Sequence, residues 1–442
     1  MMPLLFRKKW ILPLLTWILS VASANAQTTT DANNTFNQIS ISSPTAASLG
    51  KYGDIPVNYH TGIPQVNIPL YSVKSGPLSI PISLSYHASG LKVQEPASWV
   101  GAGWSLDAGG VITRTVVGAP DEKGTGNGAT QSSGHYSDYG YNNYLYNGSN
   151  QDWQAFANGN KDGEPDLFFF NIGGYSGKFY FHDDHTPVFI PDQDLKIIPY
   201  YTGGNASIQS FELITPDGTE YFFGNTPGIS GTAPIEKTLP VTAQGGQSSS
   251  NVISSWYLNK VVSADGQFTI TLSYTAENYG YFTVAMFPVD GNAVGSDAYG
   301  YNLVKNIIQG VRLNRIDFTG GSVVFNAGSV RTDLSSNIAS LFNDSTNGQA
   351  TTLGSIQINS GSTAIKKFVF SYSYFQDNTN PLNGTGITTM GYPLQTDKYR
   401  LRLDSLKEQS GDGTITLPPH SFTYFSELVP RRLTFGIDHW GY

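Results

Sequence analysis

The chain of 442 residues carries a formal net charge of −8, and only 13% of its residues are charged, while another 13% are aromatic. This acidic balance argues against nucleic acid and anionic membranes as partners, because both select basic surfaces. The absence of cysteine excludes disulfide bonds and thiolate metal sites. Many aromatic residues, 48 glycines and little charge are typical of β-strands joined by tight turns. We therefore expect an all-β fold with very little helix, built from antiparallel hairpins in β-sandwich-like or open β-shell layers.

Residues 1–26 have the pattern of a secretory signal peptide. A basic start at residues 7–9 precedes an apolar run over residues 10–21, which is shorter than the roughly 20 residues that a membrane span needs. Residues 24–26 read Ala-Asn-Ala, the small-x-small form of a signal-peptidase site. Cleavage is thus expected before Gln27. We expect a secreted or cell-surface protein that has no membrane contact after cleavage.

Composition and periodicity divide the rest of the chain. Residues 27–47 are a polar linker, and residues 48–120 form an N-terminal hairpin region. A surface loop over residues 121–165 is followed by a hairpin domain at 166–250, of which 225–250 is expected to be loop. Residues 251–442 are expected to form a hairpin-repeat domain, and we expect it to continue into a further part that this sequence does not contain.

Alternation of apolar and polar residues predicts three hairpins before residue 225. The first pairs residues 66–70 with 78–86, and Pro69 and Pro81 within these runs indicate an edge or a bulge. The second pairs residues 167–171 with 177–182. The third joins two aromatic runs through Pro-Asp-Gly at 216–218, where proline presets φ and glycine accepts a positive φ.

A loose repeat follows, with units about 40 to 55 residues apart. Each unit contains Leu-x-x-aliphatic, a glycine-containing turn and an alternating strand with aromatic residues. The four copies begin at Leu258, Leu313, Leu353 and Leu403. A single hairpin is marginally stable, whereas stacked hairpins can bury a continuous face. The alternative is that any antiparallel β protein produces such matches.

The densest local pattern, residues 99–114, is called here the glycine–tryptophan motif. Two tryptophans bracket a Gly-x-Gly, and a glycine pair then opens a β-type run that ends in arginine. Glycines beside large rings allow tight turns and close backbone approach. We interpret the motif as a folding staple with no catalytic role. Its key residues are Trp99, Gly101, Gly103, Trp104, Gly109, Gly110 and Arg114.

The motif also carries a resemblance, which residues 48–58, 84–90 and 438–442 share. These stretches resemble the N-terminal region of bacterial secreted RHS-repeat (YD-repeat) proteins. The motif is similar also to the start of the B component of insecticidal toxin complexes. The resemblance implies a non-enzymatic module of a hollow β-shell, which encases or presents a downstream toxin or effector domain. The implied partners are the RHS repeats and the cargo region of the same polypeptide.

The sequence departs from that family in one respect. It contains no Tyr-Asp-x-x-Gly-Arg unit, although such units are numerous in the family. We therefore interpret the chain as the N-terminal piece of a larger protein or as a truncated gene product. The family's autoproteolytic site and its toxin chemistry belong to parts that this sequence does not contain, so we expect neither in this chain.

Two weak candidates for a metal site stand beside an expectation of no cofactor and no catalytic residue. Asn158, Asn160 and Asp162 copy the first half of a calcium loop, but Phe169 stands where a bidentate acid belongs, so that Asp166 would have to substitute. His182 and His185 flank two aspartates and could bind Zn²⁺ or Mn²⁺. The alternative interpretations are a solvated loop and a strand-connecting turn.

Two other functions remain open at the level of the sequence. Tyrosines and a tryptophan in residues 136–153 could stack on surface glycans, which would make the chain an extracellular carbohydrate-binding β protein. A glycoside hydrolase would need a carboxylate pair whose decisive spacing is spatial. No pair is singled out by the sequence.

Overall fold

The computed structural model describes residues 62–117, 120–122, 154, 164–182, 185–202, 207–228, 231–242, 252–288, 299–341, 343–345, 347–379, 396–425 and 429–434. The chain divides into two compact units, residues 1–56 and 57–442, and every described residue belongs to the second. The expected signal peptide and linker lie outside the described residues. Most of the expected surface loop at 121–165, including the tyrosine-rich stretch, lies outside them as well.

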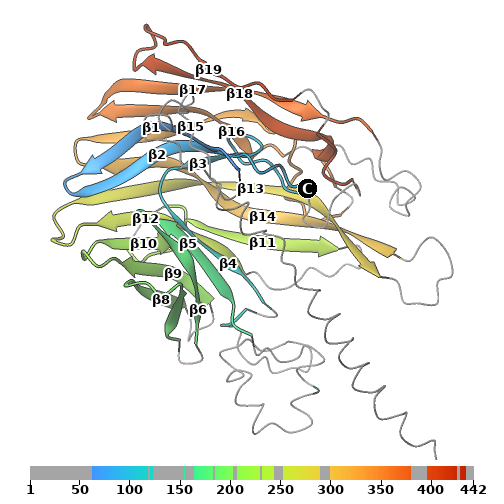
Figure 1. The fold of residues 1–442 in the computed structure, drawn as a ribbon, viewed down its shortest axis with the longest axis horizontal. Coiled ribbons are helices and arrows are strands. Elements are labelled where there is room, and N and C mark those ends of the chain that lie inside the picture. Colours follow the sequence, from blue (N-terminus) through green and yellow to red (C-terminus); the bar gives the residue numbers. More distant parts are fainter. Residues whose placement is uncertain are drawn as a thin grey trace, which may run out of the picture. The chain divides into compact units, whose positions relative to one another are not determined.

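The described residues form an all-β fold, as expected (Figure 1). A small antiparallel sheet contains β1 (Gln65–Ser75), β2 (Leu78–His87) and β3 (Trp104–Asp107). The first half of the large sheet contains β4 (Val111–Thr115), β5 (Leu167–Ile172), β6 (Tyr175–Phe181), β7 (Pro187–Ile190), β8 (Lys196–Thr202), β9 (Ser207–Ile214), β10 (Glu220–Gly224) and β11 (Ile235–Thr242). Its second half contains β12 (Ile253–Val262), β13 (Thr269–Pro288), β14 (Tyr299–Phe318), β15 (Gly321–Val330), β16 (Thr351–Ser360), β17 (Thr363–Gln376), β18 (Tyr399–Ser410) and β19 (His420–Ser421). A short 3-10 turn, η3 (Thr396–Lys398), precedes β18.

The large sheet is open and antiparallel, and its main path runs β19-β18-β17-β16-β15-β14-β11-β12-β4-β5-β6-β7. Strand β10 pairs with β12 and β9, β8 pairs with β9, and β13 pairs with β12 and β14. Because β4 lies between β12 and β5, the strand that ends the glycine–tryptophan motif joins the two expected hairpin domains in one sheet. Among the described residues, no helix is long and apolar enough to cross a lipid bilayer.

The three predicted early hairpins are confirmed as β1–β2, β5–β6 and β9–β10. A register shift in β1 directly follows Pro69, and Pro81 lies outside the stretch of β2 that pairs with β3. The expectation of loop throughout residues 225–250 is wrong, since β11 occupies part of it. Pro240 argued against a strand because proline has no backbone N–H, yet it pairs with Asn306 of β14.

The four Leu-x-x-aliphatic segments share one local structure. In each, the residue after the leucine is skipped in the pairing with an earlier strand, which makes a β-bulge. The first strand of each of the four hairpins β12–β13, β14–β15, β16–β17 and β18–β19 thus contains the same irregularity. The skipped residues are Asn259, Asn314, Gly354 and Asp404.

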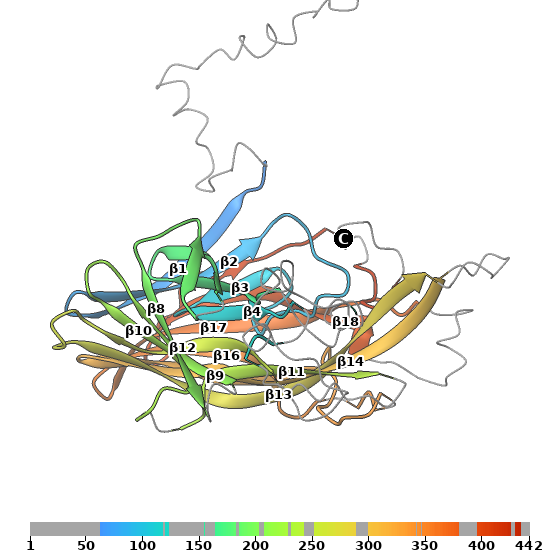
Figure 2. The same cartoon turned by 90° about the horizontal axis from the view of Figure 1, so that it is seen from below.

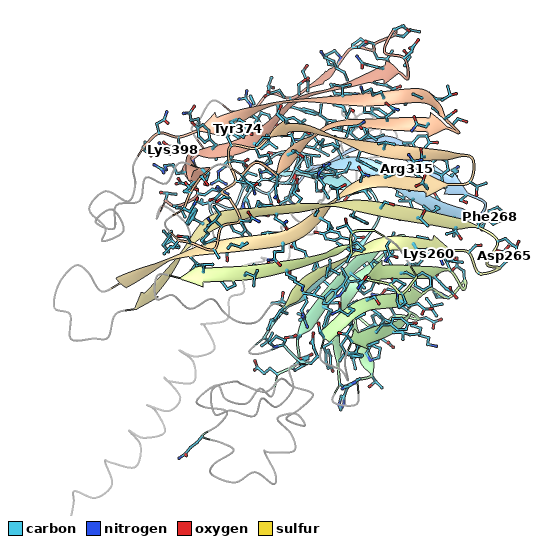
Figure 3. All side chains as sticks on the ribbon, turned by 180° about the vertical axis from the view of Figure 1, so that it is seen from behind. Lys260, Asp265, Phe268, Arg315, Tyr374 and Lys398 are labelled. Carbon is cyan, nitrogen blue, oxygen red and sulfur yellow. The ribbon has the colours of Figure 1, made fainter. Side chains whose placement is uncertain are left out.

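The small sheet packs on one side of the large sheet, and both contribute to one apolar cluster (Figure 2). Leu84 of β2 and Trp256 of β12 are fully buried in it. The β1–β2 turn is anchored where Ser75 Oγ lies 2.7 Å from Thr319 Oγ1. The adjacent Gly76 faces the Phe268 ring, which Figure 3 places at the β12–β13 end of the sheet. This packing sets the space between the sheets in which the candidate site lies.

Candidate functional site

The glycine–tryptophan motif connects the small sheet to three of the four bulged segments. Its Trp99 carbonyl accepts a hydrogen bond from Leu353 N at 3.1 Å, and its Gly110 carbonyl accepts one from Leu258 N at 2.9 Å. Its Ala102 N donates to Leu401 O at 2.8 Å, two residues before the segment that begins at Leu403. Gly101 approaches Leu403 so closely that a Cβ there would lie 3.0 Å from Leu403 N. The motif therefore joins strands that are remote in the sequence.

A tyrosine closes each of these three segments from the other side. Tyr274 donates to the Leu258 carbonyl at 2.6 Å, and Tyr372 donates to the Leu353 carbonyl at 2.9 Å. Tyr424 donates to the carbonyl of Leu403, the leucine of the fourth segment, at 2.7 Å. In these units the leucine carbonyl beside the bulge thus accepts a hydrogen bond from a tyrosine that follows later in the sequence.

Trp104 forms the aromatic end of the motif. Its indole is buried, and its Nε1 donates to Tyr424 Oη at 2.9 Å. Its ring centroid lies 4.6 Å from that of Phe422 and 5.1 Å from that of Tyr86. Gly103 has a φ of 77°, and a Cβ there would lie 2.6 Å from the Tyr86 ring, so this position requires glycine.

Arg114 forms the ionic end of the motif, and its side chain is fully buried. Its Nη1 lies 2.7 Å from Glu122 Oε2 and 3.4 Å from Asp166 Oδ2. Its Nη2 donates to the Ile253 carbonyl at 2.8 Å. The guanidinium carbon also lies 5.3 Å from the Trp256 ring centroid. Although residues 121–165 were expected to be surface loop, Glu122 is buried because it pairs with this cation.

Carboxylates outnumber cations around Arg114. Asp166 N donates to Asp121 Oδ1 at 2.9 Å, and Asp121 N donates back to Asp166 Oδ2 at 3.3 Å. Burial, followed by the charge of Asp166, raises the pKa of Asp121. Burial also raises the pKa of Asp166, although Arg114 opposes this. Asp121 and Asp166 therefore keep their protons to a higher pH than free aspartates do.

The metal-site candidates are not brought together among the described residues. Asn158, Asn160 and Asp162 lie outside those residues, and the structure places Asp166 beside Arg114, where its oxygens accept two backbone N–H groups. His182 and His185 belong to a turn in which His185 N donates to His182 O, and the His185 ring lies 5.7 Å from that of Tyr201. In the described part of the chain, no three His, Cys, Asp or Glu side chains are grouped to hold a metal ion.

An open-sided cavity of about 820 Å³ lies between the small sheet and the large sheet. Pockets of this size hold small molecules. Pro77, Leu78 and Asp107 line it from the small sheet, and the motif contributes Trp99, Gly109 and Gly110. The wall from the large sheet is rich in tyrosines and charged residues, namely Tyr221, Tyr257, Tyr274, Tyr279, Glu236, Glu277, Arg312 and Arg331.

Two glutamates flank a bare stretch of backbone on the cavity wall. Glu277 of β13 pairs directly with Gly310 of β14, and directly paired residues share one face of a sheet. Glu236 of β11 reaches the same position, since its Oε2 would lie 3.1 Å from a Cβ at Gly310. Burial raises the pKa of both glutamates. Tyr257 donates to Glu236 Oε2 at 3.2 Å.

The cavity also adjoins a buried network of arginines and aspartates. Arg331 donates to both carboxylate oxygens of Asp333, at 2.9 Å and 2.6 Å, and also to Ala97 O at 2.8 Å. Arg331 holds the pKa of Asp333 below its usual range despite burial. In a second pair of this kind, Arg431 Nη2 lies 2.6 Å from Asp397 Oδ1. Arg331, the arginine of this network that lines the cavity, therefore already has a carboxylate partner.

Sequence reasoning did not find the cavity or its two glutamates. Glu236 lay in a segment expected to be loop, and Glu277 is a single acidic residue in the middle of β13. The available signal was the group of tyrosines at 274, 279 and 281 on either side of Glu277. No protein-family model matches the chain, and no curated protein matches it.

Proposed function

We propose that the chain is a secreted, non-enzymatic structural module, the N-terminal part of an RHS-type β-shell that would encase or present a downstream domain. The observation that carries this proposal is the serial construction of the second half of the sheet. Four hairpins in succession contain the same bulge in their first strand, and one motif contacts three of them. Such construction suits a wall that grows by adding hairpins.

The last hairpin supports the same proposal. Strand β19 is only two residues long, and it pairs with β18 at Ser405 and Leu406. Beside it, Ile415 is 66% exposed and Leu417 is 50% exposed. Exposed apolar residues at a sheet edge favour pairing with a further strand. In the proposed shell, repeats of the same polypeptide would cover this edge.

Cysteine labelling tests the proposal cleanly, because the natural sequence contains no cysteine. Leu417→Cys would be compared with Val330→Cys, whose side chain is 46% exposed at the end of β15. Each variant would be labelled with a maleimide in the purified 442-residue chain and in the polypeptide exported by its natural host. We expect protection of the thiol at 417 in the exported polypeptide alone, with equal labelling at 330. Equal labelling at 417 in both samples would contradict the proposal.

A further inference from the structure

The cavity coincides with the one bulged segment that the motif leaves uncovered. Leu258, Leu353 and Leu403 each have a motif residue on one side and a tyrosine hydrogen bond on the other. Leu313, the leucine of the remaining segment, lines the cavity instead. The space is therefore located beside the bulged segment to which, among the described residues, the motif makes no backbone hydrogen bond, and its wall contains the two glutamates.

Glu236 is a half-buried acid of this cavity without an ion pair among the described residues, whereas the other unpaired acids of the lining, Asp107 and Asp217, are exposed. Glu277 has a cation nearby, since its Oε1 lies 3.8 Å from Arg312 Nε, and it also accepts a hydrogen bond from Thr351 N. Arg331 is paired with Asp333. Among the described residues, no lysine or arginine forms an ion pair with Glu236. A cation that joined this carboxylate would stabilise its ionised form beyond what the hydrogen bond from Tyr257 provides.

Aromatic side chains line the cavity that contains this carboxylate. Tyr257 donates a hydrogen bond to Glu236 through its hydroxyl group. Burial is the larger cause that raises the pKa of Tyr279, and the nearby charge of Glu236 is the second. Tyr221, Tyr274 and Trp99 line the same cavity. The faces of tyrosine and tryptophan rings attract organic cations, particularly where water is excluded. An apolar stem on the cation would contact the same rings.

We infer that this cavity binds an organic cation, an alkylammonium group whose charge pairs with Glu236 and whose stem packs among the tyrosines. The group could belong to a free amine or to a lysine side chain. This inference goes beyond the structural role proposed above and does not depend on it, because a wall segment can carry a ligand site whether or not it encloses a cargo.

Calorimetric titration of the full chain tests the inference. The probes are n-butylammonium chloride, Nα-acetyl-lysine amide and, as an uncharged comparison, methyl glucoside. We expect saturable binding of at least one ammonium probe and no binding of the glucoside. Binding of butylammonium alone would indicate a free amine, whereas preference for the lysine derivative would indicate a peptide side chain.

Variants assign the binding to the cavity. Glu236→Gln removes the charge with little change in shape, and we expect it to weaken ammonium binding by about thirtyfold or more. Glu408→Gln is the matched control, since Glu408 is about one-third exposed in a surface pair with Lys366 and should leave binding unchanged. Tyr279→Leu removes a ring and keeps the charge, so it should weaken binding by a smaller factor. Circular dichroism would verify the fold of each variant.

Three results would overturn the inference. The first is the absence of saturable binding of either ammonium probe to the unmodified chain. The second is binding of butylammonium to folded Glu236→Gln, or to Tyr279→Leu should the glutamine variant not fold, as tight as to the unmodified chain. The third is binding of methyl glucoside without binding of either ammonium probe, which would indicate a carbohydrate site.

Discussion

The two ends of the glycine–tryptophan motif are fixed by different physical forces. At one end, Trp104 is held by ring packing and by a hydrogen bond to Tyr424, with no ionised group in the contact. At the other end, Arg114 lies among three carboxyl groups, those of Asp121, Glu122 and Asp166. Shape determines the stability of the aromatic end, whereas the number of bound protons determines that of the ionic end. The stability lost on substitution should therefore depend on pH at the ionic end and should not depend on pH at the aromatic end.

The largest effect is expected at the aromatic end. Trp104→Ala should lower the free energy of unfolding by about 3–5 kcal/mol, because it removes a buried ring and leaves a cavity. Denaturant unfolding of the full chain would measure this loss, which should be similar at pH 5 and pH 8. A loss below about 1 kcal/mol would mean that the indole does not contribute to the core.

A somewhat smaller loss is expected at the ionic end. Arg114→Met keeps the apolar volume of the stem but leaves the surrounding carboxyl groups without their cation, so we expect a loss of about 3 kcal/mol. Arg315→Met is the matched control. Arg315 and Asp317 form a pair in which both side chains are 43% exposed, and such pairs contribute at most about 1 kcal/mol. Equal effects of the two substitutions in the same unfolding assay would contradict the buried network.

The smallest effect, and the one most dependent on pH, is expected for Asp121→Asn. Burial raises the pKa of this carboxyl group in the folded state, whereas in the unfolded chain it ionises near pH 4. The folded state thus binds more protons, and its stability falls as pH rises above about 4. Asparagine removes the contribution of this carboxyl group to the pH dependence of stability.

Thermal unfolding measured between pH 4 and pH 8 checks this sign. The melting temperature of Asp121→Asn should differ little from that of the unmodified chain at pH 4 and should exceed it increasingly towards pH 8. A variant whose melting temperature falls relative to the unmodified chain over this range would show that Asp121 is ionised in the folded protein.

The local hairpins could be predicted from the sequence, but their partners could not. Pro-Asp-Gly at 216–218 specifies its turn through local φ preferences, and β9 and β10 pair accordingly. The pairing of β4 with β12 joins segments that are far apart in the chain, and no local preference encodes it. Similarly, Pro240 argues locally against a strand, yet the pairing of β11 with β14 overrides it.

The candidate site was predicted less well than the fold for the same reason. Asp166 resembles a calcium ligand in the linear sequence, but the fold places Arg114, 52 residues earlier, beside it. Glu236 and Glu277 are ordinary acidic residues in the sequence. Their significance comes from Gly310, which lies between them only after three strands have paired. Spatial charge balance is not visible in a linear pattern.

The contact between Trp104 and Tyr424 also constrains the order of folding. The two residues are separated by 320 positions, so the indole cannot find its partner until nearly the whole chain is available. Proteins dominated by such distant contacts fold slowly, and their unpaired strands are exposed to aggregation in the meantime. We therefore expect the early hairpins to form first and the motif to close last, which would make its closure the final step in assembling the wall.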